Sequence, residues 1–398
     1  MVVLTRPVPS RRDNAQRRGV ADGSRAARRR HGRPRPAPAR AETVREQQWW
    51  LGALGIAKAQ QVAKGDGVVV AVIDTGVDGT QPDLAGALLP GTGTNGVASE
   101  KGWDDPDGHG TQMATVLAGR GGDGPNHVLG IAPKARLLPV AIPIGNRALK
   151  TPEGTLAEPI RYAADHGAKI INMSFTLTDD ELKQPELDAI AYARAKGAIL
   201  VAAGGNRPQG DDHVPLPARY PGVVTVAGTT RAGGLWDGSI ADGSVDIAAP
   251  AQDIIGAAPK SRYPSGFAVG SGTSGAAAIV SGLLALIWSK YPALDAANVL
   301  NRLFATARDK GTAGRDDAFG FGLIDPYAAL TATVPPVTAD PLGPIASPSA
   351  ARPSVPPSTA ASPRARTAWA RPRSAPRPSA AGRSCWRCCS SSVSPARC

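Results

Sequence analysis

An uninterrupted apolar run over residues 67–73, GVVVAVI, constrains the fold of this chain more than any other segment. The run is rich in β-branched residues, has no polar alternation and ends in Asp74. Such a run predicts a strand that is buried on both faces, which is typical of a parallel sheet with helices on each side.

Strand and helix patterns alternate after this run, and a helical or hooked apolar segment over 49–56 precedes it. The apolar patterns predict strands over 136–142, 169–175, 198–203 and 223–228, and helices over 110–117, 159–166, 186–196, 274–291 and 296–307. Gly167 and Gly197 follow two of these helices, at the position where glycine commonly ends a helix. The alternation predicts an α/β fold with one doubly wound, mainly parallel sheet, right-handed crossovers and flanking helices.

The positive charge of the chain, +12 overall, lies at its two ends. Residues 1–41 carry 12 Arg against 2 Asp, and residues 331–398 carry 9 Arg against 1 Asp. Residues 42–330 carry 24 bases and 30 acids, so the middle is mildly acidic. We therefore expect a single domain over 42–330, between two disordered segments rich in Arg, Pro, Ala or Ser. No nucleic-acid partner is expected for this domain.

All four cysteines lie within the last 14 residues, so the domain has neither a disulfide nor a thiolate metal site. They are Cys385, Cys388, Cys389 and Cys398. This cluster has no His and lacks the paired C-x-x-C spacing of zinc sites, so we expect no metal there. We find no stretch of about 18 apolar residues, and therefore expect no segment that spans a bilayer.

Three short segments carry residue types that catalysis uses. Asp74 ends the buried strand, at the sheet edge where α/β proteins place ligands. His109 lies between two glycines at the start of a predicted helix. Ser274 opens the long apolar helix, whose N-terminal partial charge favours an anion. Taken singly, each has a structural alternative, namely a loop carboxylate, a structural histidine and an N-capping serine.

Gly270, Gly272 and Gly275 also satisfy the G-x-G-x-x-G pattern of dinucleotide sites. That pattern belongs after the first strand of a βαβ unit, about 20 residues before a ribose-binding acid. Here it lies late in the chain, and the acid near that distance, Asp295, follows a helix instead of ending a strand. A nucleotide site is therefore not expected.

The order Asp, His, Ser along the chain is that of the subtilisin triad. A serine hydroxyl needs an imidazole to take its proton, and a carboxylate fixes the imidazole tautomer. Residues 42–330 resemble the subtilases, subtilisin-like serine peptidases, in the segments DTG, HGT and GTS around these three residues. The resemblance implies a serine endopeptidase with Asp74, His109 and Ser274 as its triad. It also implies that Asn206, in the segment AAGGN, is an oxyanion-hole donor.

The resemblance further implies where a substrate binds. The segment NMSF over 172–175 is similar to the strand that pairs with substrate backbone and walls the S1 pocket, although an ordinary core strand is the alternative. The implied substrate-binding residues are Met173, Ser174, Phe175, Ala203, Gly204 and Gly205. The segment GFGLID over 320–325 is similar to the closing segment of the family and places the end of the domain near Leu330.

Within the family, the chain resembles actinobacterial, mycosin-like members in the segment QQWWL over 47–51 and in the Pro-rich segment after the domain. Mycosins are associated with type VII secretion and are usually exported and tethered to the membrane. The resemblance implies a protein or peptide substrate and an extracellular or cell-surface location. A membrane tether would require a different C-terminal sequence, and we expect a monomer.

Two features depart from the family pattern. Gly275 and Ala278 stand where the family has a bulky residue and a proline, which reduces packing beneath Ser274. All four chemical groups remain, so we still expect activity. Asp83 matches a calcium ligand of the family, but the loop over 123–128 does not match the other ligands. We expect no required cofactor, with a structural calcium ion as the alternative.

Both ends lack segments that an exported peptidase needs. Residues 1–41 end in small residues like those of a signal cleavage site, but they contain no apolar core of a signal peptide. Arg, Pro, Ala and Gly are what GC-rich codons give in several frames, so one hypothesis is that both ends are mis-started or out-of-frame translation. The alternative is a pair of basic tails that bind polyanions.

The sequence leaves two functions of different classes open. The first is the serine endopeptidase. The second is a catalytically weak module with the subtilase fold, which binds peptides or acts as a scaffold. Reaction of Ser274 with a fluorophosphonate separates them, because only an activated serine reacts.

Overall fold

The computed structural model describes residues 6–7, 41–144, 155–177 and 181–344. By contacts the chain divides into two units, 1–350 and 351–398, and the second lies outside the described residues. The terminal cysteine cluster and most of the Arg-rich first segment lie outside them as well.

Within the described residues, seven parallel strands form the central sheet in the order β3-β4-β2-β5-β6-β7-β8. Their bounds are β2 Val69–Asp74, β3 Thr92–Gly93, β4 Arg136–Ala141, β5 Ile170–Met173, β6 Ile199–Ala203, β7 Val223–Thr229 and β8 Ile247–Pro250. The apolar run is β2, and its Val70 lies opposite Leu137 of β4 and Ile170 of β5. A strand with neighbours on both edges and helices on both faces has no solvent side, which explains its lack of polar residues.

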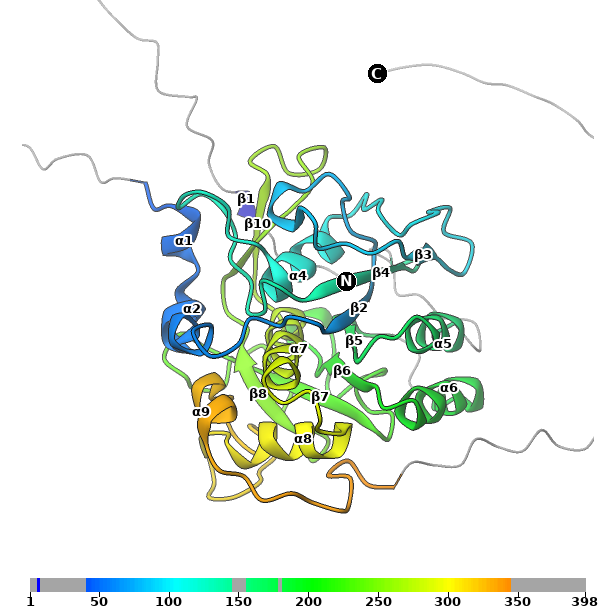
Figure 1. Cartoon of the computed structure of the whole chain (residues 1–398), viewed down its shortest axis with the longest axis vertical. Coiled ribbons are helices and arrows are strands. Elements are labelled where there is room, and N and C mark those ends of the chain that lie inside the picture. Colours follow the sequence, from blue (N-terminus) through cyan, green and yellow to red (C-terminus); the bar gives the residue numbers. More distant parts are fainter. Residues whose placement is uncertain (1–5, 8–40, 145–154, 178–180, 345–398) are drawn as a thin grey trace, which may run out of the picture. The chain divides into compact units, whose positions relative to one another are not determined.

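Helices cover both faces of this sheet (Figure 1). One face is covered by α5 (Ala157–Asp165) and α6 (Gln184–Ala195), which share an apolar cluster with side chains of β2. The other face is covered by α4 (His109–Ala118) and α7 (Thr273–Lys290). Side chains of β2 alternate between the two apolar clusters, because successive residues of a strand point to opposite faces. The predicted doubly wound α/β fold is confirmed.

A second, smaller sheet lies beside α4. In it β9 (Ile254–Ala257) pairs antiparallel with β10 (Phe267–Gly270), and β10 pairs with β1 (Arg6–Pro7). The other helices are α1 Val44–Gln47, α2 Trp49–Ala53, α3 Ile56–Ala59, α8 Ala296–Ala305 and α9 Pro326–Thr331, with 3₁₀ turns at Pro82–Leu84 and Arg207–Gln209. The predicted hooked segment over 49–56 corresponds to α2 and the start of α3.

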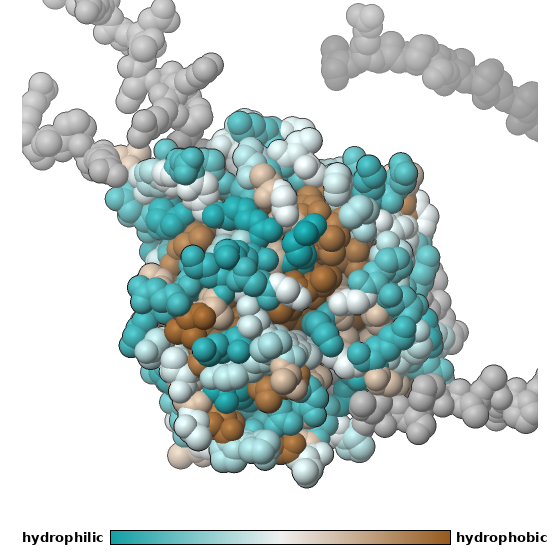
Figure 2. Space-filling model, in the orientation of Figure 1, coloured by the Kyte–Doolittle hydropathy of each residue, from teal (hydrophilic) through white to brown (hydrophobic). Residues whose placement is uncertain are grey.

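The surface facing the viewer is mostly hydrophilic, and apolar residues show mainly in its hollows (Figure 2). Among the described residues, Leu182 is the large apolar side chain that stands out, 45% exposed. The helix α7 corrects our expectation that no apolar stretch is long enough to cross a bilayer, because its 18 residues have a mean hydropathy of 1.3. The fold buries 89% of that stretch, as expected for the core helix of a globular domain.

The ends of the folded region differ from the expected limits of 42 and 330. Arg6–Pro7 forms β1, and the chain remains packed through Gly343. Asp340 pairs with Arg194 of α6 at 2.9 Å. The packing of the segment after 330 could not be predicted from its Pro-rich composition. The segment has no periodic pattern of its own and is held by side chains of α6 and α8. Two side chains of α8 bind this segment: Asn298 accepts from the Val337 N–H, and Asn301 donates to the Pro335 carbonyl.

Candidate active site

The residues implied as catalytic come from four elements that end or begin at one edge of the sheet. Asp74 is the last residue of β2, His109 the first of α4, and Ser274 the second of α7. Asn206 follows β6. His109, Asn206 and Ser274 line one small cavity of about 20 Å³. The carboxyl ends of parallel strands thus bring together residues that lie far apart in the sequence.

A buried carboxylate and imidazole form the centre of this site. His109 Nδ1 lies 2.7 Å from Asp74 Oδ1, which also accepts the backbone N–H of Thr75 at 2.8 Å. The exposed fractions of Asp74 and His109 are 0% and 4%. Among the described residues, neither Asp74 Oδ2 nor His109 Nε2 has a hydrogen-bond partner. The imidazole is therefore held through one nitrogen, and the other is free to act.

The electrostatic surroundings favour the charged form of His109. Burial is the largest single effect and lowers the pKa of this imidazole, but the charge and hydrogen bond of Asp74, together with the charges of Asp107 and Asp105, raise it more. The pKa of His109 is therefore raised above its ordinary value of 6.5. An imidazolium formed during a reaction is stabilised where it stands.

Asp105 links the segment that follows β2 to the start of α4 through hydrogen bonds. Its Oδ1 accepts from the Thr75 hydroxyl and the Gly108 N–H, both at 2.8 Å. Its Oδ2 accepts from the N–H and the hydroxyl of Thr111 at 2.8 and 2.6 Å. Burial raises the pKa of Asp105, while these hydrogen bonds act to lower it. Sequence reasoning missed this residue, and its position four residues before His109, at a helix start, was the available signal.

The two glycines beside His109 are required by backbone packing. Gly108 has φ +93°, and a Cβ there would lie 2.7 Å from the Tyr263 ring. A Cβ on Gly110 would lie 2.0 Å from the carbonyl oxygen of Gly76. Larger residues would push α4 away from the β2 exit and separate His109 from Asp74.

Ser274 lies inside the first turn of α7, since Gly272 is the N-cap and Thr273 the first helical residue. The N-capping role that we considered for this serine is therefore excluded. Its carbonyl accepts the hydroxyl of Ser174 at 3.0 Å, which ties the start of α7 to the end of β5. Ser274 is 7% exposed and lines the small cavity.

The side chain of Asn206 is held in one orientation. Its Oδ1 accepts from the backbone N–H of Thr273 at 2.8 Å and from the Thr273 hydroxyl at 3.2 Å. Its backbone N–H donates to Asp211 at 2.7 Å. Its Nδ2 donates to Oε1 of Gln209 at 3.0 Å. Sequence reasoning missed Gln209, and no pattern in the chain indicates it.

The implied substrate-binding residues do not line the small cavity. The strand β5 is paired on both edges, with β2 and β6, so Met173 offers no free edge to a peptide. The side chains of Met173 and Phe175 lie in the apolar cluster with α5 and α6. Gly204 and Gly205 are hydrogen-bonded to Val226 and Thr273. Substrate binding at Met173–Phe175 and Ala203–Gly205 stays a prediction. Ser174 and Phe175 lie beyond the end of β5, and Gly204 and Gly205 lie beyond the end of β6.

The missing bulky residue after Ser274 is compensated from another element. A Cβ on Gly275 would lie 3.0 to 3.3 Å from three side-chain atoms of Ile254. The space beneath the serine is thus filled by β9 instead of by α7. The reduced packing that the sequence suggested is absent at this position.

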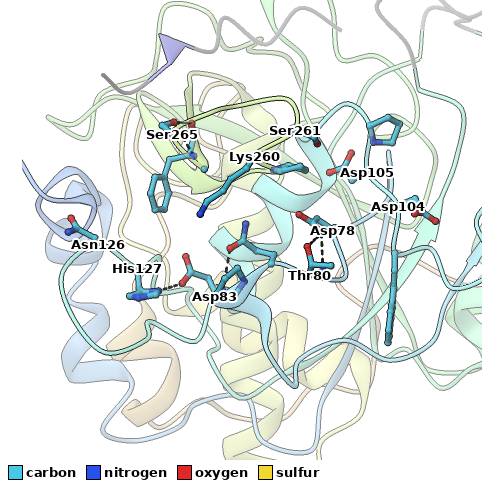
Figure 3. A pocket seen from close by; sticks show the side chains of 17 residues that line it. Asp78, Thr80, Asp83, Asp104, Asp105, Asn126, His127, Lys260, Ser261 and Ser265 are labelled. Carbon is cyan, nitrogen blue, oxygen red and sulfur yellow. Dashed lines mark hydrogen bonds and ion pairs between the residues drawn. The ribbon is translucent and has the colours of Figure 1, made fainter. Parts of the chain in front are cut away.

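A cavity of about 860 Å³ lies beside Asp105 and contains Asp83 in its wall (Figure 3). The carboxylate of Asp83 is fully engaged, by His127 Nδ1 at 2.5 Å and the Val128 N–H at 2.9 Å. Arg45 donates to the carbonyls of Gly121 and His127 in the same loop. These residues do not fit calcium, because a guanidinium and an imidazole already bind the oxygens that it would need.

Known proteins are similar to this chain in sequence and in fold. The family model described as the subtilase family, Peptidase S8, matches residues 65–322. Mycosin-1 of Mycobacterium tuberculosis is 35% identical over 338 residues, which cover 72% of this chain and 74% of mycosin-1. The crystal structure of MycP1 from the ESX-1 type VII secretion system matches with a TM-score of 0.64 and 32% identity, over 78% of this chain and 91% of that one. A chain in the structure of an intact ESX-5 inner membrane complex matches with a TM-score of 0.62 and 30% identity, over 82% and 84%.

Proposed function

The chain belongs to the subtilase family of serine peptidases, and from this premise we propose that it cleaves peptide bonds with Ser274 as nucleophile and His109 as its base. The observation that carries the proposal is the Asp74–His109 hydrogen bond at 2.7 Å. It leaves Nε2 of the imidazole without a partner among the described residues, in a site that also contains Ser274.

In the proposed mechanism the Ser274 hydroxyl attacks the scissile carbonyl carbon while His109 Nε2 takes the hydroxyl proton. The imidazolium then gives this proton to the leaving amine, and an acyl-enzyme remains on Ser274. Water then attacks the acyl carbon while His109 Nε2 takes a proton from it. The bond from this carbon to Ser274 Oγ breaks, His109 returns the proton to Oγ, and the acid leaves. Asp74 holds the imidazole tautomer with Nδ1 protonated and stabilises the imidazolium.

We assign stabilisation of the developing oxyanion to Asn206 and to the backbone N–H of Ser274. The contact of Asn206 Oδ1 with Thr273 supports this role, because it fixes the amide and leaves Nδ2 as the donor. The start of α7 adds the partial positive charge of a helix N-terminus. Removing such an amide costs about 100- to 1000-fold in kcat in subtilisin, a member of the same family.

The second candidate is a catalytically weak module with the same fold. Two observations on the described residues favour it: His109 Nε2 has no hydrogen bond to Ser274 Oγ, and the cavity at Ser274 is small. Catalytic hydrogen bonds are often formed only when substrate is bound, so these observations fit a resting peptidase as well.

The similarity to mycosin-1 and to a chain of the ESX-5 inner membrane complex supports a role at the cell envelope. We propose a protein substrate handled by a type VII secretion system, with an extracellular or cell-surface location and a monomeric catalytic domain.

Peptide hydrolysis by the full chain tests the proposal. Ser274→Ala should abolish hydrolysis of an unstructured protein such as casein while its melting temperature stays that of the parent. Ser289→Ala is the matched control, because Ser289 lies in the same helix near its other end. If the parent hydrolyses nothing, or if Ser274→Ala retains its rate, the proposed peptidase is excluded.

A further inference from the structure

A glutamine side chain contacts the amide that the proposed mechanism assigns to the oxyanion. Gln209 ends the 3₁₀ turn Arg207–Gln209, which begins directly after Asn206. Its Oε1 accepts from Asn206 Nδ2 at 3.0 Å, and Gln209 lines the same cavity as Ser274. An uncharged carbonyl oxygen thus takes one of the two N–H groups of the amide nitrogen that the substrate oxyanion would use.

Gln209 is not needed to orient Asn206. The amide oxygen of Asn206 is already held by the N–H of Thr273 at 2.8 Å and by the Thr273 hydroxyl at 3.2 Å. These contacts determine the direction of Nδ2 by themselves. The hydrogen bond with Gln209 therefore gives Asn206 Nδ2 an acceptor but does not set the direction of this group.

The free space beside Ser274 is small. The cavity measures about 20 Å³, and a single water molecule needs roughly 10–15 Å³ by the same kind of measure. A substrate carbonyl that approaches Asn206 Nδ2 from the side of Gln209 meets this side chain first. Gln209 is half-buried, and its neighbours Arg207, Pro208 and Gly210 are exposed.

We propose that Gln209 is an internal plug of the oxyanion hole, which a substrate must displace before Ser274 can attack. The inference rests on the proposed function. The backbone of Gln209 can stay in place, since its N–H donates to the Asn206 carbonyl at 2.8 Å, so rotation of the side chain is sufficient. The plug is a substrate mimic built into the chain, and it lowers the reactivity of the resting enzyme.

The test compares two substitutions with opposite expected effects. Gln209→Ala frees Asn206 Nδ2, so the rate constant for labelling by a fluorophosphonate and kcat/KM for a short peptide should each rise about 2- to 10-fold, the value of one ordinary hydrogen bond. Gln209→Glu should lower both, because a carboxylate accepts the N–H more strongly and repels the oxyanion. Gln184→Ala, on the surface of α6, is the matched control and should change neither.

A double-mutant cycle shows whether the effect passes through Asn206. In an Asn206→Ala background, Gln209→Ala should no longer increase the labelling rate. Melting temperatures of all variants separate changes of rate from changes of folding. If the parent is labelled but Gln209→Ala reacts at the parental rate or more slowly, the plug is overturned and the peptidase stands. If the folded parent is not labelled at all, the proposed function itself fails.

Discussion

The proposed chemistry depends on His109, and the surroundings of this residue raise the pKa of its imidazole. It is buried with Asp74 at 2.7 Å, and Asp105 and Asp107 lie near enough to act on it. A base of raised pKa is a stronger proton acceptor, but it is protonated over a wider range of acidic pH. Both effects can be detected by measuring reaction rates as a function of pH.

We expect the acid limb of kcat/KM to have its midpoint above 6.5, since His109 must be neutral to accept the proton of Ser274. Asp74→Asn removes the charge that raises the pKa, so the midpoint should move to lower pH while kcat falls by roughly 10⁴-fold. Initial rates across the pH range measure both. An acid limb centred at or below 6.5 in the parent would contradict the assignment.

Residues that carry chemistry could be predicted from sequence, whereas residues that support them could not. Asp74, His109 and Ser274 lie in short segments whose order is informative. Asp105 and Gln209 act through contacts that only the fold creates. A buried hydrogen bond requires no fixed spacing in the sequence, so no motif marks Gln209, and only its position before a predicted helix could have indicated Asp105.

At the scale of elements, the long periodic segments were predictable and the short ones were not. The predicted helix over 274–291 is observed at Thr273–Lys290, and the predicted strand over 136–142 at Arg136–Ala141. Strands such as β3, with two residues, and β9, with four, carry too few residues to show a period. Yet β9 supplies Ile254, which supports the start of α7.

This contact between elements predicts the effect of restoring a large residue after the serine. Gly275→Leu should destabilise the domain by about 1–3 kcal/mol and lower kcat, because its side chain meets Ile254. Combining Gly275→Leu with Ile254→Ala should recover much of both losses. Chemical denaturation and peptide hydrolysis measure them. If Gly275→Leu alone is neutral, Ile254 does not fill that space.

At the scale of the whole molecule, the folded region extends beyond the end that the family resemblance implied. The segment after α9 returns across α8 and reaches α6, where Asp340 pairs with Arg194. The side chain of Arg194 is only 7% exposed, so its charge depends on this partner and on the Gly343 carbonyl.

A chain that ends after Pro344 should melt like the full chain, whereas one that ends after Leu330 should melt at a lower temperature. Removing the partner of a buried charge costs about 3–5 kcal/mol, so Asp340→Ala should reproduce most of the loss. Thermal melts of the four proteins provide the comparison. Equal melting of the two truncated chains would show that residues 331–344 do not stabilise the domain.

The oxygens around Asp83 are bound by His127 and Arg45, so we expect a domain that does not depend on calcium. The melting temperature should be unchanged by EDTA and by added Ca²⁺. Arg45→Leu should lower it under both conditions, because it leaves two carbonyls of the loop without their donor. A melting temperature that falls in EDTA and recovers with Ca²⁺ would contradict this expectation.

Mass spectrometry of the intact chain after reaction with a fluorophosphonate tests the central claim most directly. We predict one adduct per molecule, located by peptide mapping on Ser274, reduced strongly in His109→Ala and absent from Ser274→Ala. A folded parent that carries no adduct, or an adduct on another serine, would contradict the account of Ser274 as the nucleophile that His109 activates.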